Sequence, residues 1–181
     1  LGVRGSARDL AAAGLGILKP LNATPVEGTY DSPINVTLNF EANYEDACTH
    51  FLGRHFRGLT NGPSPDWLRR RLTAIGLRPI SALVDMTNYV TYDLGRPLHV
   101  FDAGKVTGDI QARMATAGET FLALDGKDYE LDGEITVIAD QKAAEAIGGV
   151  MGGEASGCTE ETTEMFLEAA LFNAHRTAAT G

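Results

Sequence analysis

Cysteine is scarce in this 181-residue chain, which has only Cys48 and Cys158, far apart in the sequence. Neither belongs to a Cys-x-x-Cys motif, so the sequence argues against a structural zinc site. Such a pair could form a disulfide in a secreted protein, but two free thiols in a cytoplasmic one are the favoured interpretation. The sequence therefore predicts a cytoplasmic protein without a bound metal.

Long apolar runs are also missing. Apolar residues make up 44% of the chain, yet no run reaches the roughly 18 residues that would span a membrane. The first residues show no signal-peptide pattern. We therefore expect no membrane partner. The chain opens without an initiator Met, and we expect it to be a piece of a longer protein.

Positive charge is in short supply, because the formal net charge is −9. Residues 101–168 carry fifteen acids against four bases, whereas residues 41–80 carry six arginines against four acids. A protein that grips a long nucleic-acid backbone should be basic. The composition therefore allows at most a local nucleic-acid contact through the arginine-rich section, and an ordinary solvated surface is the simpler interpretation.

Signatures of nucleotide and nucleophile chemistry are absent as well. Residues 146–157 hold five glycines, but no Gly-Lys-Ser/Thr follows them, and their spacing does not fit the dinucleotide-binding pattern. Backbone N–H groups of such a loop could still line a pocket. No Ser-His or Cys-His pair is apparent, so a covalent acyl-enzyme is not expected.

The order of patterns predicts an α+β fold, with a mixed or antiparallel β-sheet core and flanking helices. Residues 1–35 read as a helix and a Pro/Gly linker, the remnant of a preceding domain. Residues 36–181 then form one domain, whose far end we expect beyond the chain. Asp125-Gly126 predicts a hairpin turn. Helices are expected at 64–76 and 79–95, and strands at 36–40, 50–59 and within 110–140.

The densest group of polar side chains lies in residues 81–102. In the predicted helix, an apolar stripe should face the core, formed by Leu83, Met86, Val90 and Leu94. Thr87 and Asn88 fall away from this stripe. Their side chains compete for backbone partners, so a helix that contains them either bends there or uses them.

A Gly-Arg-Pro turn at residues 95–97 ends that helix and leads into an extended segment. Along it, His99 and Phe101 should face one way, and Leu98 and Val100 the other. A histidine beside a phenylalanine is often structural. Thr87 and Asn88 lie on the helix before the turn, and the reversal of the chain could bring them near His99. A functional role for His99 is therefore as open as a structural one.

Glu168 stands in the apolar segment 165–172. If the segment is a strand, Glu168 shares a face with Phe166, Ala170 and Phe172. A buried carboxylate must then accept hydrogen bonds from protein or ligand. The acids at 160–164 keep a helix as the alternative, and in a helix Glu168 would be less confined.

Three separated motifs resemble the B3/B4 region of the β subunit of bacterial phenylalanyl–tRNA synthetase. They are GLRPISALVDMTNYVTYDLGRPLHVFD at 76–102, GGVMGGE at 148–154 and FLEAALF at 166–172. The opening LGVRGSARDL also resembles the segment before that region, so the resemblance covers nearly the whole chain. Asn173-Ala174 replaces the usual Asp-Pro.

The resemblance implies an editing domain that hydrolyses tyrosine wrongly esterified to tRNA(Phe). An apolar pocket penalises one added hydroxyl by only about 10²-fold, so a second site that requires the hydroxyl discriminates better. Glu168 matches the residue that meets the tyrosine hydroxyl. Thr87, Asn88 and His99 match residues near the ester, as catalytic candidates. The implied amino-acid pocket also includes Gly149, Gly152, Gly153, Ala170 and Pro97.

His99 could orient or deprotonate the attacking water, and a water activated by the terminal ribose of the tRNA is equally compatible. Asn88 and Thr87 would position the ester or support oxyanion charge. The fragment itself should need no cofactor, since ATP and Mg²⁺ serve the full enzyme. The implied partners are the tRNA(Phe) 3′ end carrying tyrosine and the α subunit of an α2β2 heterotetramer. The alternative is a non-catalytic tRNA- or protein-binding module of the same subunit.

Overall fold

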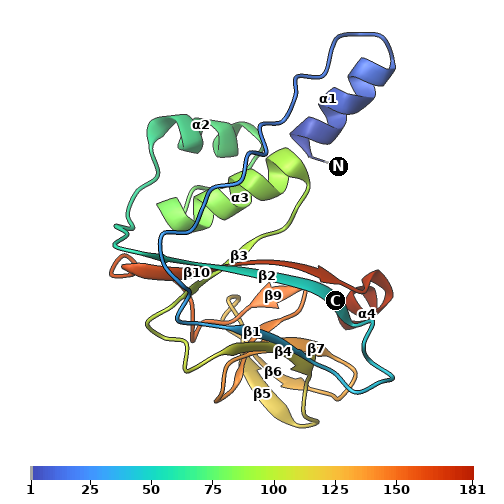
Figure 1. Cartoon of the computed structure of the whole chain (residues 1–181), viewed down its shortest axis with the longest axis vertical. Helices are drawn as coiled ribbons and strands as arrows, with labels where there is room; N and C mark the ends of the chain where they lie inside the picture. The colour runs from blue at the N-terminus through green and yellow to red at the C-terminus, as the bar shows by residue number, and fades with distance from the viewer. Residues whose placement is uncertain (1) are drawn as a thin grey trace.

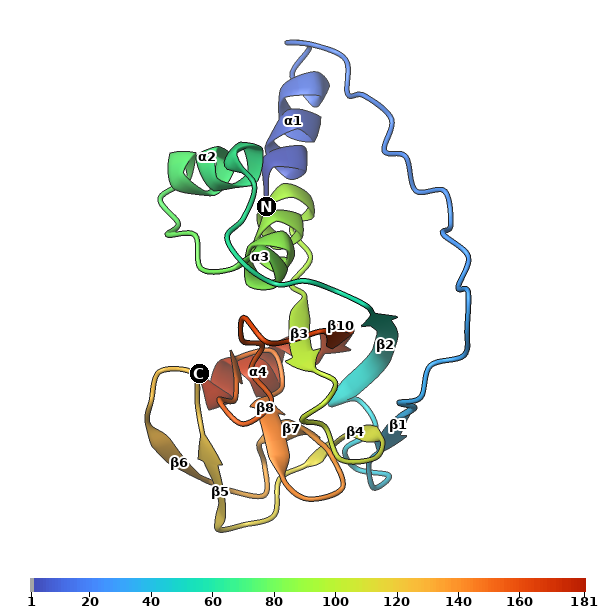
Figure 2. The same cartoon turned by 90° about the vertical axis from the view of Figure 1, so that its left-hand side faces the viewer.

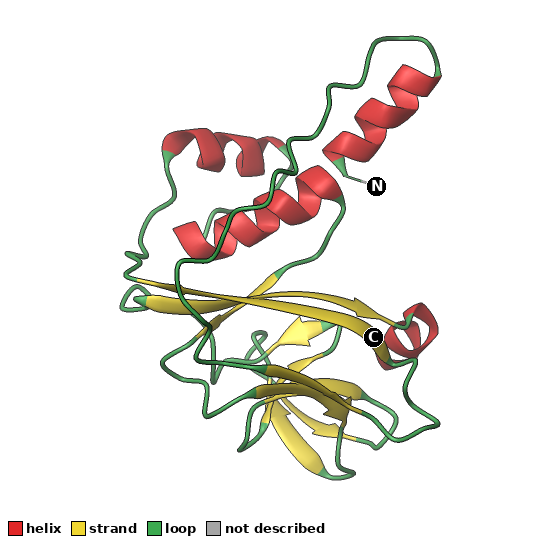
Figure 3. Ribbon diagram, viewed as in Figure 1, coloured by secondary structure: helices red, strands yellow, loops and turns green. Residues whose placement is uncertain are grey.

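The computed structural model describes residues 2–181, which form a helical layer over two stacked β-sheets (Figure 1). Figure 3 shows the same arrangement by secondary structure, with three helices above the sheets and one at their edge. The elements are α1 (Val3–Ala12), β1 (Val36–Asn39), β2 (Cys48–Arg57), α2 (Asp66–Ala74), α3 (Ala82–Leu94), β3 (His99–Asp102), β4 (Ile110–Met114), β5 (Glu119–Leu122), β6 (Asp128–Leu131), β7 (Thr136–Ala139), β8 (Ala144–Ile147), β9 (Met151–Gly152), β10 (Glu164–Phe172) and α4 (Ala174–Thr180).

The middle layer is an antiparallel sheet in the order β2-β10-β3. Its central strand β10 confirms the strand interpretation of residues 165–172. Phe166 is buried toward the second sheet, whereas Met165 is buried toward the helices. The alternation expected for β3 holds too, because Phe101 joins the inter-sheet core and Val100 the helical side.

The lower sheet has the order β1-β4-β7-β8-β9, and the separate hairpin β5-β6 packs beside it. Only the β1-β4 pair is parallel among the paired strands of residues 2–181. The predicted Asp125-Gly126 turn connects β5 and β6, with Gly126 at a φ of 76°. The mixed and antiparallel sheets with flanking helices confirm the expected α+β class.

Large apolar side chains fill the space between the two sheets. Phe101 and Phe166 from the middle sheet meet Ile110, Ile138 and Ala146 from the lower one, and all five are buried. This core lies between β10 and β8, and α4 lies at one end of the two sheets (Figure 1).

The helical layer covers the opposite face of the middle sheet. Leu83 of α3 packs on Val100 and Met165. The rest of the predicted stripe is wrong in part, because Met86 and Leu94 are 44% and 38% exposed. The cause is a polar group that turns inward in their place.

That group is Asp85, whose side chain is fully buried. It accepts a hydrogen bond from Ser64 Oγ at 2.5 Å and another from the Ile80 backbone N–H at 2.9 Å. Both donors lie in the segments that flank α2, so Asp85 ties the start of α2 to the connection between α2 and α3. Buried polar groups that are hydrogen-bonded in this way can replace apolar residues on a helix face.

The N-terminal segment packs through α1 on α3 and then runs as an exposed connection to β1, standing apart from the body in Figure 2. Its end is held by Tyr30, whose hydroxyl lies 3.0 Å from His55 Nδ1 on β2. The division of the chain at residue 35 stays a prediction. None of the helices in residues 2–181 is long and apolar enough to cross a membrane.

Candidate functional site

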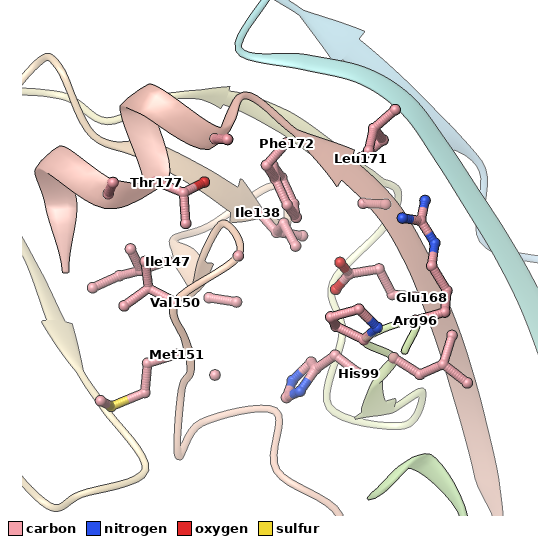
Figure 4. A pocket seen from close by; sticks show the side chains of 18 residues that line it. Arg96, His99, Ile138, Ile147, Val150, Met151, Glu168, Leu171, Phe172 and Thr177 are labelled. Carbon is pink, nitrogen blue, oxygen red and sulfur yellow. The ribbon is translucent and has the colours of Figure 1, made fainter. Parts of the chain in front are cut away.

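A pocket of about 520 Å³ opens between the two sheets at the end where α4 lies. The middle sheet supplies residues of β3 and β10, the lower sheet supplies residues of β7, β8 and β9, and α4 closes one side (Figure 4). The lining is mainly apolar, and its ionisable members are Glu168, His99 and Arg96. Ligand sites are typically of this size and kind, mostly apolar with a few placed polar groups.

Glu168 lies at the buried end of this pocket. It is 6% exposed, and its Oε2 has no hydrogen-bond partner within residues 2–181. On β10 it shares the inward face with Phe166, as the sequence predicted for a strand. Burial raises the pKa of the Glu168 carboxyl to about 8. A buried carboxyl without a partner is costly, so the pocket holds a polar atom ready for a ligand.

His99 is the direct neighbour of Glu168, because the two are paired across β3 and β10. Figure 4 shows both side chains on the same wall. The His99 ring packs edge-on against Phe101 at 4.6 Å between centroids, and its Nε2 is buried without a partner. Burial lowers the pKa of His99 to about 4, so the imidazole is neutral near pH 7.

Gly53 lies on the other side of Glu168, opposite it on β2. A Cβ at Gly53 would fall 2.0 Å from Cζ of Phe166, because the Phe166 ring occupies the space that a side chain would need. Glu168 is therefore held between an aromatic ring and an imidazole, with no charged neighbour on either adjacent strand position.

The glycine-rich loop forms the facing wall. Gly152 lies against the His99 ring, and a Cβ there would fall 2.4 Å from His99 Cε1 and 3.1 Å from Leu124 Cδ1. Gly149 has a φ of 72° and lies near Phe172 and Thr177. Close approach and a left-handed backbone thus account for these two glycines.

The structure brings together six of the nine predicted site residues. His99, Glu168, Gly149, Gly152, Ala170 and Pro97 all line the pocket. Gly153 instead packs against Phe121 and the Glu145 carbonyl on the far side of the loop. Thr87 and Asn88 lie on α3 and are not among the lining residues. Thr87 Oγ1 donates to the Val84 carbonyl at 2.7 Å.

Sequence reasoning missed the contribution of α4. Ala174, Thr177 and Ala178 line the pocket beside Phe172. Asn173 caps this helix by accepting hydrogen bonds from the backbone N–H groups of His175 and Arg176. Asparagine is a preferred N-cap residue, so Asn173 was a signal for a helix start that could have been used. The same capping bonds show how the chain turns where the usual Asp-Pro is replaced.

Alanine at position 152 is expected to displace the His99 ring, since close packing leaves no space for the added methyl group. The NMR signals of the His99 ring report its displacement. Gly133→Ala is the control, because a Cβ there has no contact shorter than 4.0 Å. Unchanged His99 signals in Gly152→Ala would contradict the expectation.

The two perturbed pKa values predict a pH dependence of stability. Glu168 has a pKa of about 8 against an ordinary 4.5, so the unfolded chain releases a proton that the folded chain keeps, and stability falls as pH rises toward 8. His99, lowered from 6.5 to about 4, acts oppositely and removes stability as pH falls below 6.5. The two slopes nearly cancel between pH 4.5 and 6.5.

Above pH 6.5 only the Glu168 effect remains. Wild-type stability should fall there by about 1.4 kcal/mol per pH unit relative to Glu168→Gln. Urea unfolding at pH 6.5 and pH 8 measures this difference. Glu160→Gln, at an exposed position, should follow the wild type. Parallel pH profiles for wild type and Glu168→Gln would show that Glu168 carries no raised pKa.

Known proteins resemble this chain over the residues that form the fold and the pocket. Residues 47–181 match the family described as B3/4 domain. The whole chain is 63% identical to the phenylalanine–tRNA ligase β subunit of Paramagnetospirillum magneticum and 57% identical to that of Cereibacter sphaeroides. It spans only 23% and 22% of those relatives' lengths.

A solved structure shares the fold. It is an N-terminal fragment of the phenylalanyl–tRNA synthetase β subunit from Pyrococcus horikoshii, with a TM-score of 0.57 at 16% identity, covering 96% of this chain and 52% of that one. The resemblance drawn from the three motifs is thereby confirmed, and the chain belongs to the B3/4 domain family.

Proposed function

We propose that this chain is the editing domain of a phenylalanine–tRNA ligase β subunit and that it hydrolyses the ester of tyrosine wrongly attached to tRNA(Phe). The buried, unpartnered Oε2 of Glu168 in an apolar pocket carries the proposal. The phenol group of tyrosine can hydrogen-bond this carboxyl, whereas phenylalanine would leave it unpaired. Such an unpaired group costs about 1–3 kcal/mol, which favours tyrosine.

The protonation state of Glu168 suits this role. With a pKa of about 8, the carboxyl is mostly neutral near pH 7. A protonated carboxyl can both donate and accept a hydrogen bond, as can a phenol. Binding therefore requires no transfer of a bare carboxylate from water, and the preference comes from pairing two neutral polar groups in an apolar site.

His99 is the side chain best placed to act on water at the ester. Its neutral ring has a free Nε2 that lies beside Gly152, on the wall adjoining Glu168. A neutral imidazole can accept a proton from water or orient it. With the phenol at Glu168, the ester would lie toward the open end of the pocket, on the side of His99 where Arg96 and Pro97 lie. Thr87 and Asn88 lie outside this pocket, so we assign His99 the leading role here.

The decisive experiment uses the complete enzyme with both subunits, supplied with Tyr-tRNA(Phe) and Phe-tRNA(Phe) as separate substrates. We expect release of tyrosine at least ten times faster than release of phenylalanine. Equal rates, or none for either substrate, would refute the proposal. No release would instead favour the non-catalytic binding module. ATP and Mg²⁺ belong in this proposal to aminoacylation elsewhere in the enzyme, and the hydrolysis should proceed without them.

A further inference from the structure

Arg96 is the cation at the mouth of the pocket. No other arginine or lysine lines the pocket, all of whose lining lies within residues 2–181. Its side chain is exposed and makes no hydrogen bond or ion pair with the described part of the chain. Figure 4 shows its guanidinium between the Leu171 and Glu168 side chains in this view.

A rigid turn presents Arg96. Gly95 adopts the left-handed conformation, with a φ of 69°, and its N–H bonds the Thr91 carbonyl at 2.8 Å. Thr91 Oγ1 accepts a hydrogen bond from the Leu98 N–H at 3.3 Å and donates to the Thr87 carbonyl at 2.8 Å. Together with the fixed φ of Pro97, these bonds pin both ends of the turn. Arg96 is therefore displayed on a short, anchored segment rather than on a free loop.

The pocket has a polarity along its length. Its inner end holds Glu168, and the exposed residues Arg96, Pro97, Leu171 and Ala174 form its rim. The extended segment from Arg96 to His99 spans about 10 Å. A ligand that places a hydroxyl at Glu168 would thus carry any anionic group toward Arg96. The net charge of −9 repels polyanions, which makes a local cation at the entrance valuable.

We propose that Arg96 binds the phosphate next to the esterified ribose of the substrate. The inference rests on the proposed function, because it takes the substrate to be an aminoacyl ester at the end of a nucleic acid. A guanidinium matches a phosphate with two parallel hydrogen bonds and keeps its charge at all working pH values. In this arrangement Glu168 selects the amino acid, and Arg96 selects the nucleotide that carries it.

The test uses the complete two-subunit enzyme and a stable amide analogue, 3′-(L-tyrosylamino)-3′-deoxyadenosine, with and without a 5′-phosphate. Calorimetry should show that the wild type binds the phosphorylated form about tenfold more tightly. R96Q should lose this preference and R96K should retain part of it. R70Q, an exposed arginine of α2 outside the pocket, should keep it in full. The preference should weaken as salt rises.

The affinity of each variant for the unphosphorylated analogue reports whether its pocket is intact. A wild type without phosphate preference, or an R96Q variant that keeps it, overturns the inference. Failure of the proposed function is a different result: the enzyme would show the phosphate preference yet release no tyrosine from Tyr-tRNA(Phe). Tyrosine release without any phosphate preference would remove the role of Arg96 alone.

Discussion

Alanine in place of Glu168 is expected to lower the ratio of tyrosine release to phenylalanine release by about two orders of magnitude in the complete enzyme. Under the proposed function, the substitution removes the partner of the tyrosine hydroxyl and, with it, the penalty that phenylalanine meets at an unpaired carboxyl. Rates of both reactions, measured on Tyr-tRNA(Phe) and Phe-tRNA(Phe), give the ratio directly. The loss should come partly from faster release of phenylalanine, which a merely damaged site would not produce.

The stability of the Glu168→Ala variant shows whether a changed release ratio is caused by unfolding. Glu168 is 6% exposed and its Oε2 is unpaired, so its removal relieves a buried polar group even as it opens a space. The Glu168→Ala variant should therefore stay folded at pH 8. Glu160→Ala, at an exposed position outside the pocket, serves as the control and should leave the ratio unchanged. A preserved ratio in Glu168→Ala would mean that tyrosine is recognised elsewhere.

Asp85→Ala should destabilise the chain by about 3–5 kcal/mol, the largest loss that we expect from a single substitution in the helical layer. Two hydrogen bonds to the carboxyl group disappear, and the Ser64 hydroxyl remains buried without its partner, while the partly buried Ile80 N–H loses its acceptor. Hydrogen bonds to a charged group contribute about 1.5–3 kcal/mol each. Chemical unfolding measures the loss, which should also lower the melting temperature by about 6–20 °C.

Met86→Ala is the matched control for Asp85→Ala, since Met86 follows it on α3 and is 44% exposed. Its cost should stay well below that of Asp85→Ala, although hydrophobicity alone ranks the two residues in the opposite order. A larger loss for Met86→Ala than for Asp85→Ala would contradict the hydrogen-bond explanation and restore the apolar stripe that the sequence predicted.

Periodicity predicted strand β10 of the site better than helix α3 of the layer above it. Alternation over residues 165–172 predicted that Glu168 shares an inward face with Phe166. The prediction holds because side chains of a strand alternate between two faces, so residues two apart always share one. On α3 the same kind of reasoning was right for Leu83 and wrong for Met86 and Leu94. The donors that hold Asp85 come from Ser64 and Ile80, outside the helix itself, and a pattern within the helix cannot register them.

Sequence patterns could not predict the cavity itself, because its walls come from segments that come together only in the folded chain. The resemblance to a family supplied six lining residues, but the partners of the glycine-rich loop were not visible. Gly149 owes its role to Phe172 and Thr177, and Gly152 to His99. A glycine in a sequence can indicate that another group packs closely against the backbone, but it does not identify that group.

The empty position at Gly53 gives β2 an influence on a pocket to which it contributes no lining residue. The Phe166 ring rests where a side chain from β2 would stand, and Glu168 is the next inward residue of β10. Any substitution at Gly53 must displace that ring, which lies two residues before Glu168 on the same face of β10. The shape of the pocket near Glu168 can therefore change through the edge strand β2 while every residue that lines the pocket stays the same.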